Sequence, residues 1–299
     1  MADQGDHGIS WTGVTWSPIT GCTRVSPGCE HCYSERLSAG RLAHLDRYAG
    51  TTRNGRWTGQ VNLHPDLLDL PLTWRKPRMI FVCSMSDLFH KAVPDEFLAA
   101  VWATMAATPR HCYQLLTKRP ERLQEFDRWM PPIAPGRGVY PALPVEQFAA
   151  SPLANVWLGT SVEDQPRADK RIPCLLQTPA TVRWLSVEPM LGPVDLEGFR
   201  LGGTVRGFAA LDWVVCGGES GPGARPMKLT WARDLRDQCT EAGVAFWMKQ
   251  MGSVWARENK SRWPDGKLDS HGSCMENWPP DLRVRQWPAG FVPPNTRNE

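Results

Sequence analysis

Residues 212–250 have the sequence "DWVVCGGESGPGARPMKLTWARDLRDQCTEAGVAFWMKQ". Its two ends, 212–218 and 244–250, are short apolar runs without clean alternation of polar and apolar residues, which is typical of strands buried on both faces. Between them, residues 230–243 have the pattern of a helix, with Thr230 as the expected N-cap and Gly243 just past the last turn. This segment therefore predicts two parallel strands joined by a helix.

Apolar runs of the same kind recur along the chain. They lie near 14–18 and at 78–85, 112–117, 155–161 and 182–188. From the second run on, successive starts are roughly 30 residues apart, the spacing of a strand–helix repeat, apart from one longer gap. Further helices are predicted at 94–107 and 120–130. Alternating strands and helices indicate a mostly parallel sheet, so we predict an α/β fold, either a full or partial barrel or an open doubly wound sheet.

Two segments depart from this repeat. The Pro- and Gly-rich stretch 131–154 predicts a loop insertion. Residues 252–299 are rich in Trp, Pro and charged side chains and lack clear periodicity, so we expect an irregular C-terminal extension of a barrel that spans 1–251. A chain of 299 residues with 41% hydrophobic and 22% charged residues suits this organisation, one large domain with an appendage.

The overall charge and the N-terminus exclude some classes of protein. Lys and Arg number 34 and Asp and Glu 31, a net charge of +3, which argues against binding of nucleic acid through overall charge but not against a local basic groove. The opening "MADQGDHGIS" lacks the basic and apolar regions of a secretory signal. The longest apolar stretch, 97–107, is too short to cross a bilayer. We therefore expect a cytoplasmic protein with no membrane partner.

Polar side chains and glycines follow the apolar runs. In parallel α/β folds the carboxyl ends of the strands form the functional face, so these residues are expected to converge. They are Ser84, Ser86, Asp87, Thr117, Lys118, Arg119, Thr160, Ser161, Glu163, Ser186, Glu188, Gly217, Gly218, Glu219, Ser220, Lys249 and Gln250. The candidates for a catalytic role among them are Glu163, Glu188, Glu219, Lys118 and Lys249.

Three of the nine cysteines, Cys22, Cys29 and Cys32, form a C-x6-C-x2-C pattern directly after the first predicted strand. An odd number of cysteines in a chain of this size argues against a disulfide framework. Thiolates are soft ligands that suit zinc or an iron–sulfur cluster. Structural zinc needs a fourth ligand, and the nearest is His31, awkwardly placed between two of the cysteines. Three thiolates suit a [4Fe–4S] cluster with one open iron, and zinc is the alternative.

Beyond the cysteines, several blocks resemble one family. They are "TWSPITGCTRVSPGCEHCY" at 15–33, "SMSDLFH" at 84–90, "LLTKRPERL" at 115–123, "SVEPMLGP" at 186–193 and "CGGESGPGARPM" at 216–227. Together they resemble a phage- and prophage-associated group of radical S-adenosylmethionine (radical SAM)-like proteins, whose reaction is unassigned. The commonest cysteine pattern in the radical SAM superfamily is C-x3-C-x2-C, so the first gap here is three residues longer.

This resemblance implies a partial (β/α)6-type TIM-like barrel of the radical SAM kind. It also implies that Cys22, Cys29 and Cys32 ligate a [4Fe–4S] cluster whose open iron binds S-adenosylmethionine. Reductive cleavage of that cofactor gives a 5′-deoxyadenosyl radical, which abstracts hydrogen from a substrate. The electron comes from a flavodoxin- or ferredoxin-like donor. The residues that the resemblance assigns to S-adenosylmethionine are His31, Ser84, Ser86, Asp87, Thr160, Ser161, Gly217, Gly218 and Glu219.

The substrate stays open between classes. Strand-end basic residues, together with the phage association, favour a nucleic acid, a nucleotide or a modified base. The residues expected to bind such an anion are Lys118, Arg119, Arg225 and Lys249. One alternative is a radical SAM enzyme that acts on a small metabolite or a peptide. The other is a cluster- or zinc-binding protein that interacts with nucleic acid without radical chemistry.

Overall fold

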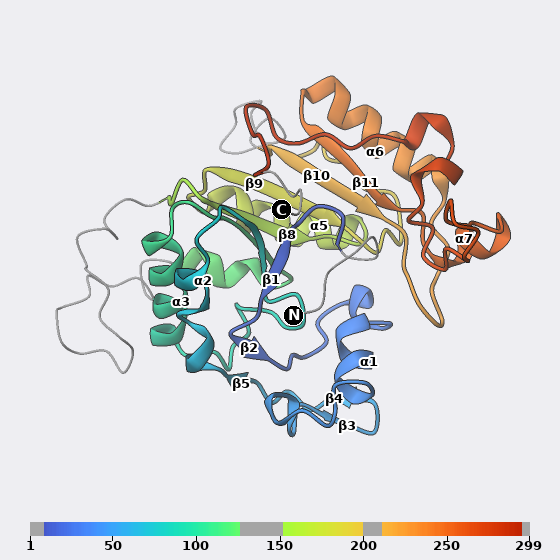
Figure 1. Ribbon diagram of the computed structural model, residues 1–299. Helices are drawn as coiled ribbons and strands as arrows, with labels where there is room; N and C mark the ends of the chain where they lie inside the picture. Colours follow the sequence, from blue (N-terminus) through green and yellow to red (C-terminus); the bar gives the residue numbers. More distant parts are fainter. Residues whose placement is uncertain (1–8, 126–151, 200–210, 295–299) are drawn as a thin grey trace.

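The centre of the molecule is a parallel sheet of seven strands that curls into a half-barrel (Figure 1). The computed structural model describes residues 9–125, 152–199 and 211–294. The strands pair in chain order and each pair is parallel. They are β1 (Val14–Trp16), β6 (Met79–Val82), β7 (Cys112–Thr117), β8 (Val156–Ser161), β9 (Val182–Val187), β10 (Trp213–Gly217) and β11 (Ala245–Gln250). The predicted α/β class is confirmed and every predicted run forms a strand, while the curled sheet of seven strands, not six, is compatible with the expected partial barrel.

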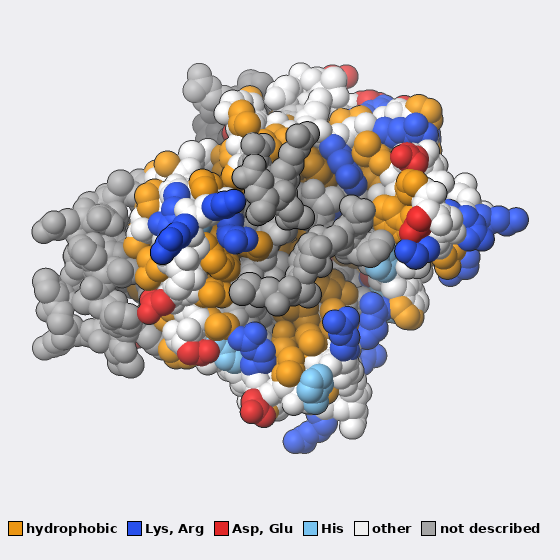
Figure 2. Space-filling model, in the orientation of Figure 1, with side chains coloured by type: hydrophobic (Ala, Val, Ile, Leu, Met, Phe, Trp, Pro, Cys, Tyr) orange, Lys and Arg blue, Asp and Glu red, His pale blue; other side chains and the backbone are white. Residues whose placement is uncertain are grey.

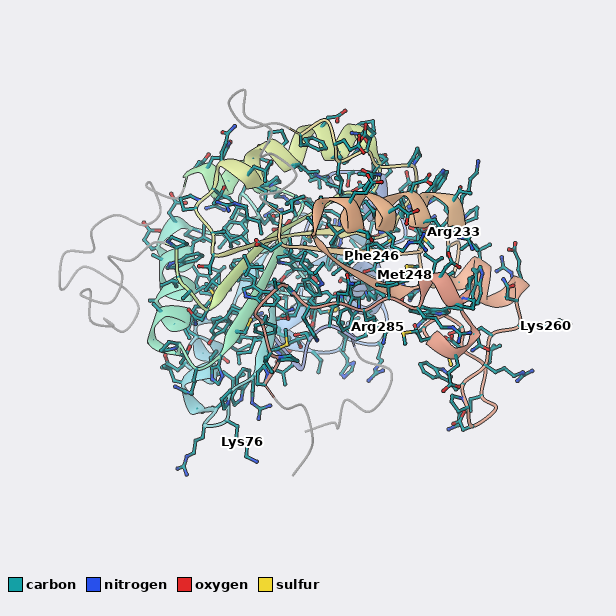
Figure 3. The ribbon with its side chains drawn as sticks, turned by 90° about the horizontal axis from the view of Figure 1, so that it is seen from above. Lys76, Arg233, Phe246, Met248, Lys260 and Arg285 are labelled. Atoms are coloured by element: carbon teal, nitrogen blue, oxygen red, sulfur yellow. The ribbon has the colours of Figure 1, made fainter. Side chains whose placement is uncertain are left out.

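Helices cover the outer face of the half-barrel. They are α3 (Asp95–Ala107), α5 (Gln165–Gln177) and α6 (Leu229–Ala242). Their apolar faces share one buried cluster with outward-facing strand residues such as Val214 and Met248. Phe246 and Met248 on β11 lie beneath α6 (Figure 3). The sheet is therefore covered on this face as parallel sheets require.

Two details of the helix prediction were wrong. Helix α6 begins at Leu229 and its N-cap is Lys228, whose backbone is extended, so Thr230 lies inside the first turn. The helix expected over 120–130 is a 3-10 segment at Pro120–Glu125, and the rest lies outside the described residues. Arg122 holds that segment against the start of α3 through hydrogen bonds to the carbonyl of Val93 (2.6 Å) and to Asp95 (2.7 Å). Gly243 ends α6 in the left-handed conformation (φ 70°), as predicted.

Tryptophans fill the inner face of the half-barrel at the amino ends of the strands. Side chains alternate between the two faces of a strand, so one residue in two points inward. The inward tryptophans are Trp157, Trp184, Trp213 and Trp247, which Trp11 and, from the C-terminal segment, Trp287 and Phe291 join. Their rings meet edge-on or tilted, for example Trp184 and Trp213 at 5.4 Å. This tryptophan floor closes one end of the half-barrel.

A long excursion separates β1 from β6. It contains the short pairs β2 (Ile19–Thr20) with β5 (Asn62–Leu63) and β3 (Thr52–Arg53) with β4 (Arg56–Trp57). It also contains the helices α1 (Tyr33–Ala39) and α2 (Leu70–Thr73). Gly21 forms an isolated bridge with Ser86, just beyond the end of β6. The excursion is thus anchored over the carboxyl end of the sheet, where the three cysteines lie.

The C-terminal extension, residues 252–294, runs along β11 and packs on the half-barrel (Figure 1). It contains α7 (Ser253–Glu258) and two 3-10 turns, η7 (Met275–Asn277) and η8 (Pro280–Leu282). The indole of Trp213 donates a hydrogen bond to the carbonyl of Gln286 (2.9 Å), which ties the extension to the tryptophan floor. The predicted insertion at 131–154 falls largely outside the described residues. Across the described ranges, no helix has the length and apolar character needed to span a bilayer.

Candidate functional site

The three clustered cysteines lie in the cysteine loop, defined as residues 21–32, at the carboxyl end of the sheet. Cys22 follows β2, Cys29 ends the 3-10 turn η1 (Pro27–Cys29), and Cys32 is at the N-cap position of α1. All three are free thiols and are partly exposed. The loop is therefore where the topology of a parallel half-barrel places a functional site.

The cysteine loop carries three free thiols, which are soft metal ligands. Within the described residues, no three His, Cys, Asp or Glu side chains are grouped to hold one metal ion. A [4Fe–4S] cluster does not need three side chains on a single ion, because each cysteine ligates a different iron. The three thiols on this loop are donors of the type that an iron–sulfur or zinc site uses.

Asp87 and Arg119 hold the start of the cysteine loop. Arg119 forms a buried ion pair with Asp87 (2.7 Å) and donates hydrogen bonds to the backbone carbonyl (2.9 Å) and hydroxyl (2.7 Å) of Thr23. The same guanidinium lies 3.8 Å from the sulfur of Cys22. Burial, and after it the charge of Asp87, raises the pKa of Cys22 to about 12, while Arg119 acts in the opposite direction. Arg119 is thus the cation that favours a thiolate at Cys22.

Glu163 holds the middle of the cysteine loop. Its carboxylate is fully buried and accepts a hydrogen bond from the backbone N–H of Gly28 (3.1 Å). A Cβ on Gly28 would lie 3.0 Å from this carboxylate, so glycine permits the close approach. Arg171 of α5 forms an ion pair with the same carboxylate (2.9 Å). Burial acts to raise the pKa of Glu163, but Arg171 and the hydrogen bonds outweigh it and lower that pKa.

Glu219 and Arg225 hold the end of the cysteine loop. Arg225 donates to both oxygens of the Glu219 carboxylate (2.6 and 2.9 Å). The same guanidinium donates to the backbone carbonyl of Pro27 (2.9 Å) and to the carboxylate of Glu30 (2.9 Å). Bidentate pairs of this kind fix geometry as well as charge. Three strand-end carboxylates, Asp87, Glu163 and Glu219, thus fasten the cysteine loop to the sheet.

Four polar side chains form the lumen mouth, defined as Lys118, Ser161, Glu188 and Lys249. Ser161, Glu188 and Lys249 lie at even spacings from the inward tryptophans of their strands, so they point into the half-barrel. The ammonium of Lys249 donates to both oxygens of Glu188 (2.8 Å each), and that of Lys118 donates to the Ser161 hydroxyl (3.3 Å). A Cβ on Gly217 would approach the Glu188 carboxylate to 3.3 Å. The mouth therefore offers two cations and a carboxylate above the tryptophan floor.

The other residues that the family resemblance assigns to S-adenosylmethionine lie around the cysteine loop and the lumen mouth. Several of them form hydrogen bonds within the protein. The Ser86 hydroxyl donates to the carbonyl of Ile19 (3.0 Å), and the Thr160 hydroxyl donates to the carbonyl of Thr117 (2.8 Å). The backbone carbonyl of Ser84 accepts hydrogen bonds from the hydroxyls of Tyr33 and Ser34. A Cβ on Gly218 would meet a backbone carbonyl at 2.3 Å.

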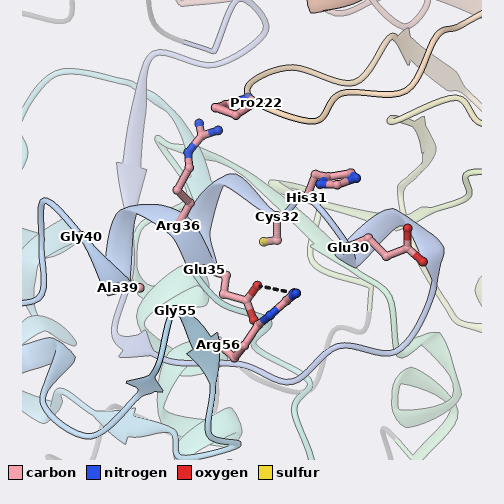
Figure 4. Close-up of a pocket in the computed structure, with 10 residues that line it drawn as sticks. All are labelled: Glu30, His31, Cys32, Glu35, Arg36, Ala39, Gly40, Gly55, Arg56 and Pro222. Carbon is pink, nitrogen blue, oxygen red and sulfur yellow. Dashed lines mark ion pairs between the residues drawn. The ribbon is translucent and has the colours of Figure 1, made fainter.

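A pocket of about 360 Å³ opens beside Cys32 (Figure 4). His31, Glu30, Arg36 and Arg56 are among the residues that line it. The Glu35 carboxylate in this pocket is held by Arg24 and by the backbone N–H of Trp57 (2.8 Å). His31 is exposed there, with a ring atom 3.0 Å from the position of a Cβ on Gly223.

Residues 6–279 match the model of one protein family, described as Protein of unknown function (DUF5131). The chain belongs to this family. No curated protein and no solved structure matches it. The DUF5131 match includes the cysteine loop, all seven strands of the half-barrel and most of the C-terminal extension.

Arg171 is a structural member of this DUF5131 site that the sequence patterns did not predict. It lies in α5, whose start carried a recognisable signal: Asp164 accepts a hydrogen bond from the backbone N–H of Arg167 (3.1 Å), and a proline follows in the first turn. Arg171 falls on the buried face of that helix beside Ile172. A charged residue on an apolar helix face predicts a buried partner, which here is Glu163.

Proposed function

We propose that this protein is a radical SAM enzyme that binds a [4Fe–4S] cluster through Cys22, Cys29 and Cys32. The observation that carries the proposal is the placement of three free thiols on one loop, which follows the first strand of a parallel half-barrel and the short strand β2. The fastening of that loop by Asp87, Glu163 and Glu219 adds support, because a cluster site needs ligands held by a rigid scaffold.

With a cluster and S-adenosylmethionine bound, one-electron reduction supplies a 5′-deoxyadenosyl radical that abstracts hydrogen from the substrate. The protein's own part is to hold the ligands and exclude water. Arg119 donates toward the Cys22 sulfur and offsets the negative charge that thiolates bring to this loop. The tryptophan floor closes the half-barrel beneath the site, which limits access of solvent.

In this proposal the lumen mouth binds the polar groups of S-adenosylmethionine and substrate. Asp87 is poorly suited to a ligand's amino group, because its oxygens already accept hydrogen bonds from Thr117, Arg119 and two backbone N–H groups. Glu188 faces the lumen with Lys249 as its partner and can accept an ammonium donor instead. Lys118 and Lys249 can bind a carboxylate or a phosphate. The electron donor in this proposal is a flavodoxin- or ferredoxin-like protein.

The experiment is anaerobic reconstitution with iron and sulfide, followed by metal and sulfide analysis. The protein should hold about four iron atoms and four sulfides per chain. The Cys22→Ala, Cys29→Ala and Cys32→Ala variants should each lose most of this iron. Cys174→Ala, which removes a partly exposed thiol of α5, is the matched control and should keep it. One tightly held zinc with no iron would contradict the proposal.

A further inference from the structure

A second pocket continues the one beside Cys32. Its volume is about 500 Å³, and it lies between α1, the loop after β10 and the C-terminal extension. Arg36 and Pro222 line both pockets, so the two pockets adjoin, and together they are called the groove. One end of this groove is at Cys32, and the other is at α7 and the segment that follows it.

The far half of the groove is strongly basic. Four cations line it, namely Arg36, Arg257, Lys260 and Arg262, against one carboxylate, Asp269. That carboxylate is buried and already accepts hydrogen bonds from the Ser261 hydroxyl and the backbone N–H groups of His271 and Cys274. It therefore does little to neutralise the groove.

The cations of the groove are unpaired and exposed. Within the described ranges, no carboxylate lies within ion-pair distance of Arg36, Arg257, Lys260 or Arg262, and all four side chains are exposed. By contrast, the basic residues around the cysteine loop, such as Arg119 and Arg225, are each paired with a carboxylate. Figure 2 shows basic side chains gathered over the C-terminal extension and over α1. The groove therefore carries unpaired positive charge that a ligand can contact.

Arg36 connects the basic half to the cysteine loop. It lies four residues after Cys32, and its backbone N–H donates to the Cys32 carbonyl (3.2 Å), so the two residues are one helical turn apart at the start of α1. Its guanidinium passes over Gly221, where a Cβ would lie 2.3 Å from Nη1. Gly221 also has φ 97°, a conformation that L side chains rarely adopt. The loop after β10 is therefore shaped to let this cation lie in the groove.

We propose that this groove binds a single strand of nucleic acid, whose backbone phosphates contact Arg36, Arg257, Lys260 and Arg262. Unpaired, exposed cations that line one pocket can supply the sequence-independent part of nucleic-acid binding. The pocket volumes suit individual nucleotides, and the exposed Leu268 (64%) offers an apolar surface for a base. That the bound strand is the substrate rests on the proposed radical SAM function, since the groove ends at Cys32.

The test compares two triple variants of the full-length protein by fluorescence anisotropy with labelled oligonucleotides. Arg257→Gln, Lys260→Gln, Arg262→Gln removes charge from the groove. Arg75→Gln, Lys76→Gln, Lys170→Gln removes the same charge from exposed positions elsewhere, and Lys76 and Lys260 project from opposite ends of the molecule (Figure 3). The probes are single-stranded DNA, single-stranded RNA and duplex DNA of one sequence, each over a range of salt concentrations.

We expect the wild-type protein to bind at least one single strand more tightly than the duplex. The groove variant should weaken that binding roughly tenfold or more and reduce the slope of log affinity against log salt by about 2, while the control variant should change neither. No binding to any probe, tighter binding to the duplex, or an equal loss in both variants would overturn the inference. Because binding is measured without turnover, these results are independent of S-adenosylmethionine cleavage. A failure here would leave the proposed function standing.

Discussion

Arg225 joins Glu219, at the end of the sixth strand of the half-barrel, to the backbone of Pro27 in the cysteine loop. One guanidinium donates to the carboxylate (2.6 Å) and to the carbonyl (2.9 Å) at the same time. The two partners are contributed by segments almost 200 residues apart in sequence. Through this contact the last part of the barrel fixes the loop that follows the first strand.

Removal of the Arg225 guanidinium, which bridges Glu219 and Pro27, should loosen the cysteine loop without unfolding the protein. We predict that the reconstituted Arg225→Met variant loses iron to a chelator roughly tenfold faster than the wild type, because residues that orient metal ligands usually contribute on that scale. Loss of visible absorption after chelator addition measures the rate. Arg233→Met is the matched control, since Arg233 forms a comparable pair with Asp281 on the surface. Equal rates of iron loss in the wild type and both variants would refute a role for the Arg225 bridge in holding the cluster ligands.

Glu163 and Arg171 form the most deeply buried ion pair around the loop, with both side chains under 5% exposed. Arg171→Met leaves the Glu163 carboxylate buried without its cation and should cost about 3–5 kcal/mol of unfolding free energy. The nearby pair of Arg167 and Asp164 is partly exposed, so Arg167→Met should cost about 1 kcal/mol or less. Urea unfolding of the two variants gives the comparison, and equal losses would show that burial is not what matters.

Asp269 makes stability depend on pH. Burial acts to raise the pKa of Asp269, but hydrogen bonds from backbone N–H groups and from Ser261 outweigh it and lower that pKa below its ordinary value of 3.8. A lowered carboxyl pKa stabilises the fold above the unfolded value, and this contribution is lost as pH falls through the folded value. Asp269→Asn should therefore be less stable than the wild type above about pH 5, with the difference shrinking at lower pH. Thermal unfolding across pH measures it, and a constant difference would contradict this account.

Gly159, an inward-facing residue of β8 between Trp157 and Ser161, gives room to Trp184. A Cβ at Gly159 would lie 2.5 Å from the indole ring, so Gly159→Ala forces the tryptophan floor to shift. We expect a loss of about 1–3 kcal/mol in unfolding free energy, the usual cost of overpacking. Gly198→Ala, where a Cβ meets no atom within 4 Å, should change stability little. No change in the unfolding free energy of the Gly159→Ala variant would mean that the tryptophan floor rearranges without an energetic cost.

The strands of the half-barrel could be predicted because each is an apolar run buried on both faces. The runs at 112–117 and 182–188, for example, match β7 and β9 to within one residue. The excursion after β1 could not be predicted in the same way, since strands of two residues, such as β3 and β4, are too short to show a period. Helix α5 was missed because it is polar overall and contains Pro173.

The positions of the charged residues at the site could be predicted from the sequence, but their ion-pair partners could not. The sequence placed Asp87, Glu163 and Glu219 at strand ends, and the structure brings all three to the cysteine loop. Arg119 and Arg225 were expected to bind an anionic substrate, whereas in the structure each is paired with a carboxylate. Such pairs join residues that are distant in sequence, so no local pattern records them. The basic groove was missed for the same reason, because Arg36 and Lys260 meet only in the fold.

Formation of 5′-deoxyadenosine is the decisive readout for radical chemistry in this protein. The reconstituted protein is incubated anaerobically with dithionite and S-adenosylmethionine, and the product is quantified by mass spectrometry. The control is the Cys22→Ala, Cys29→Ala, Cys32→Ala triple variant. We expect the native protein to form 5′-deoxyadenosine and the triple variant to form none. A native protein that holds an intact cluster, binds S-adenosylmethionine and yet forms no 5′-deoxyadenosine would contradict it.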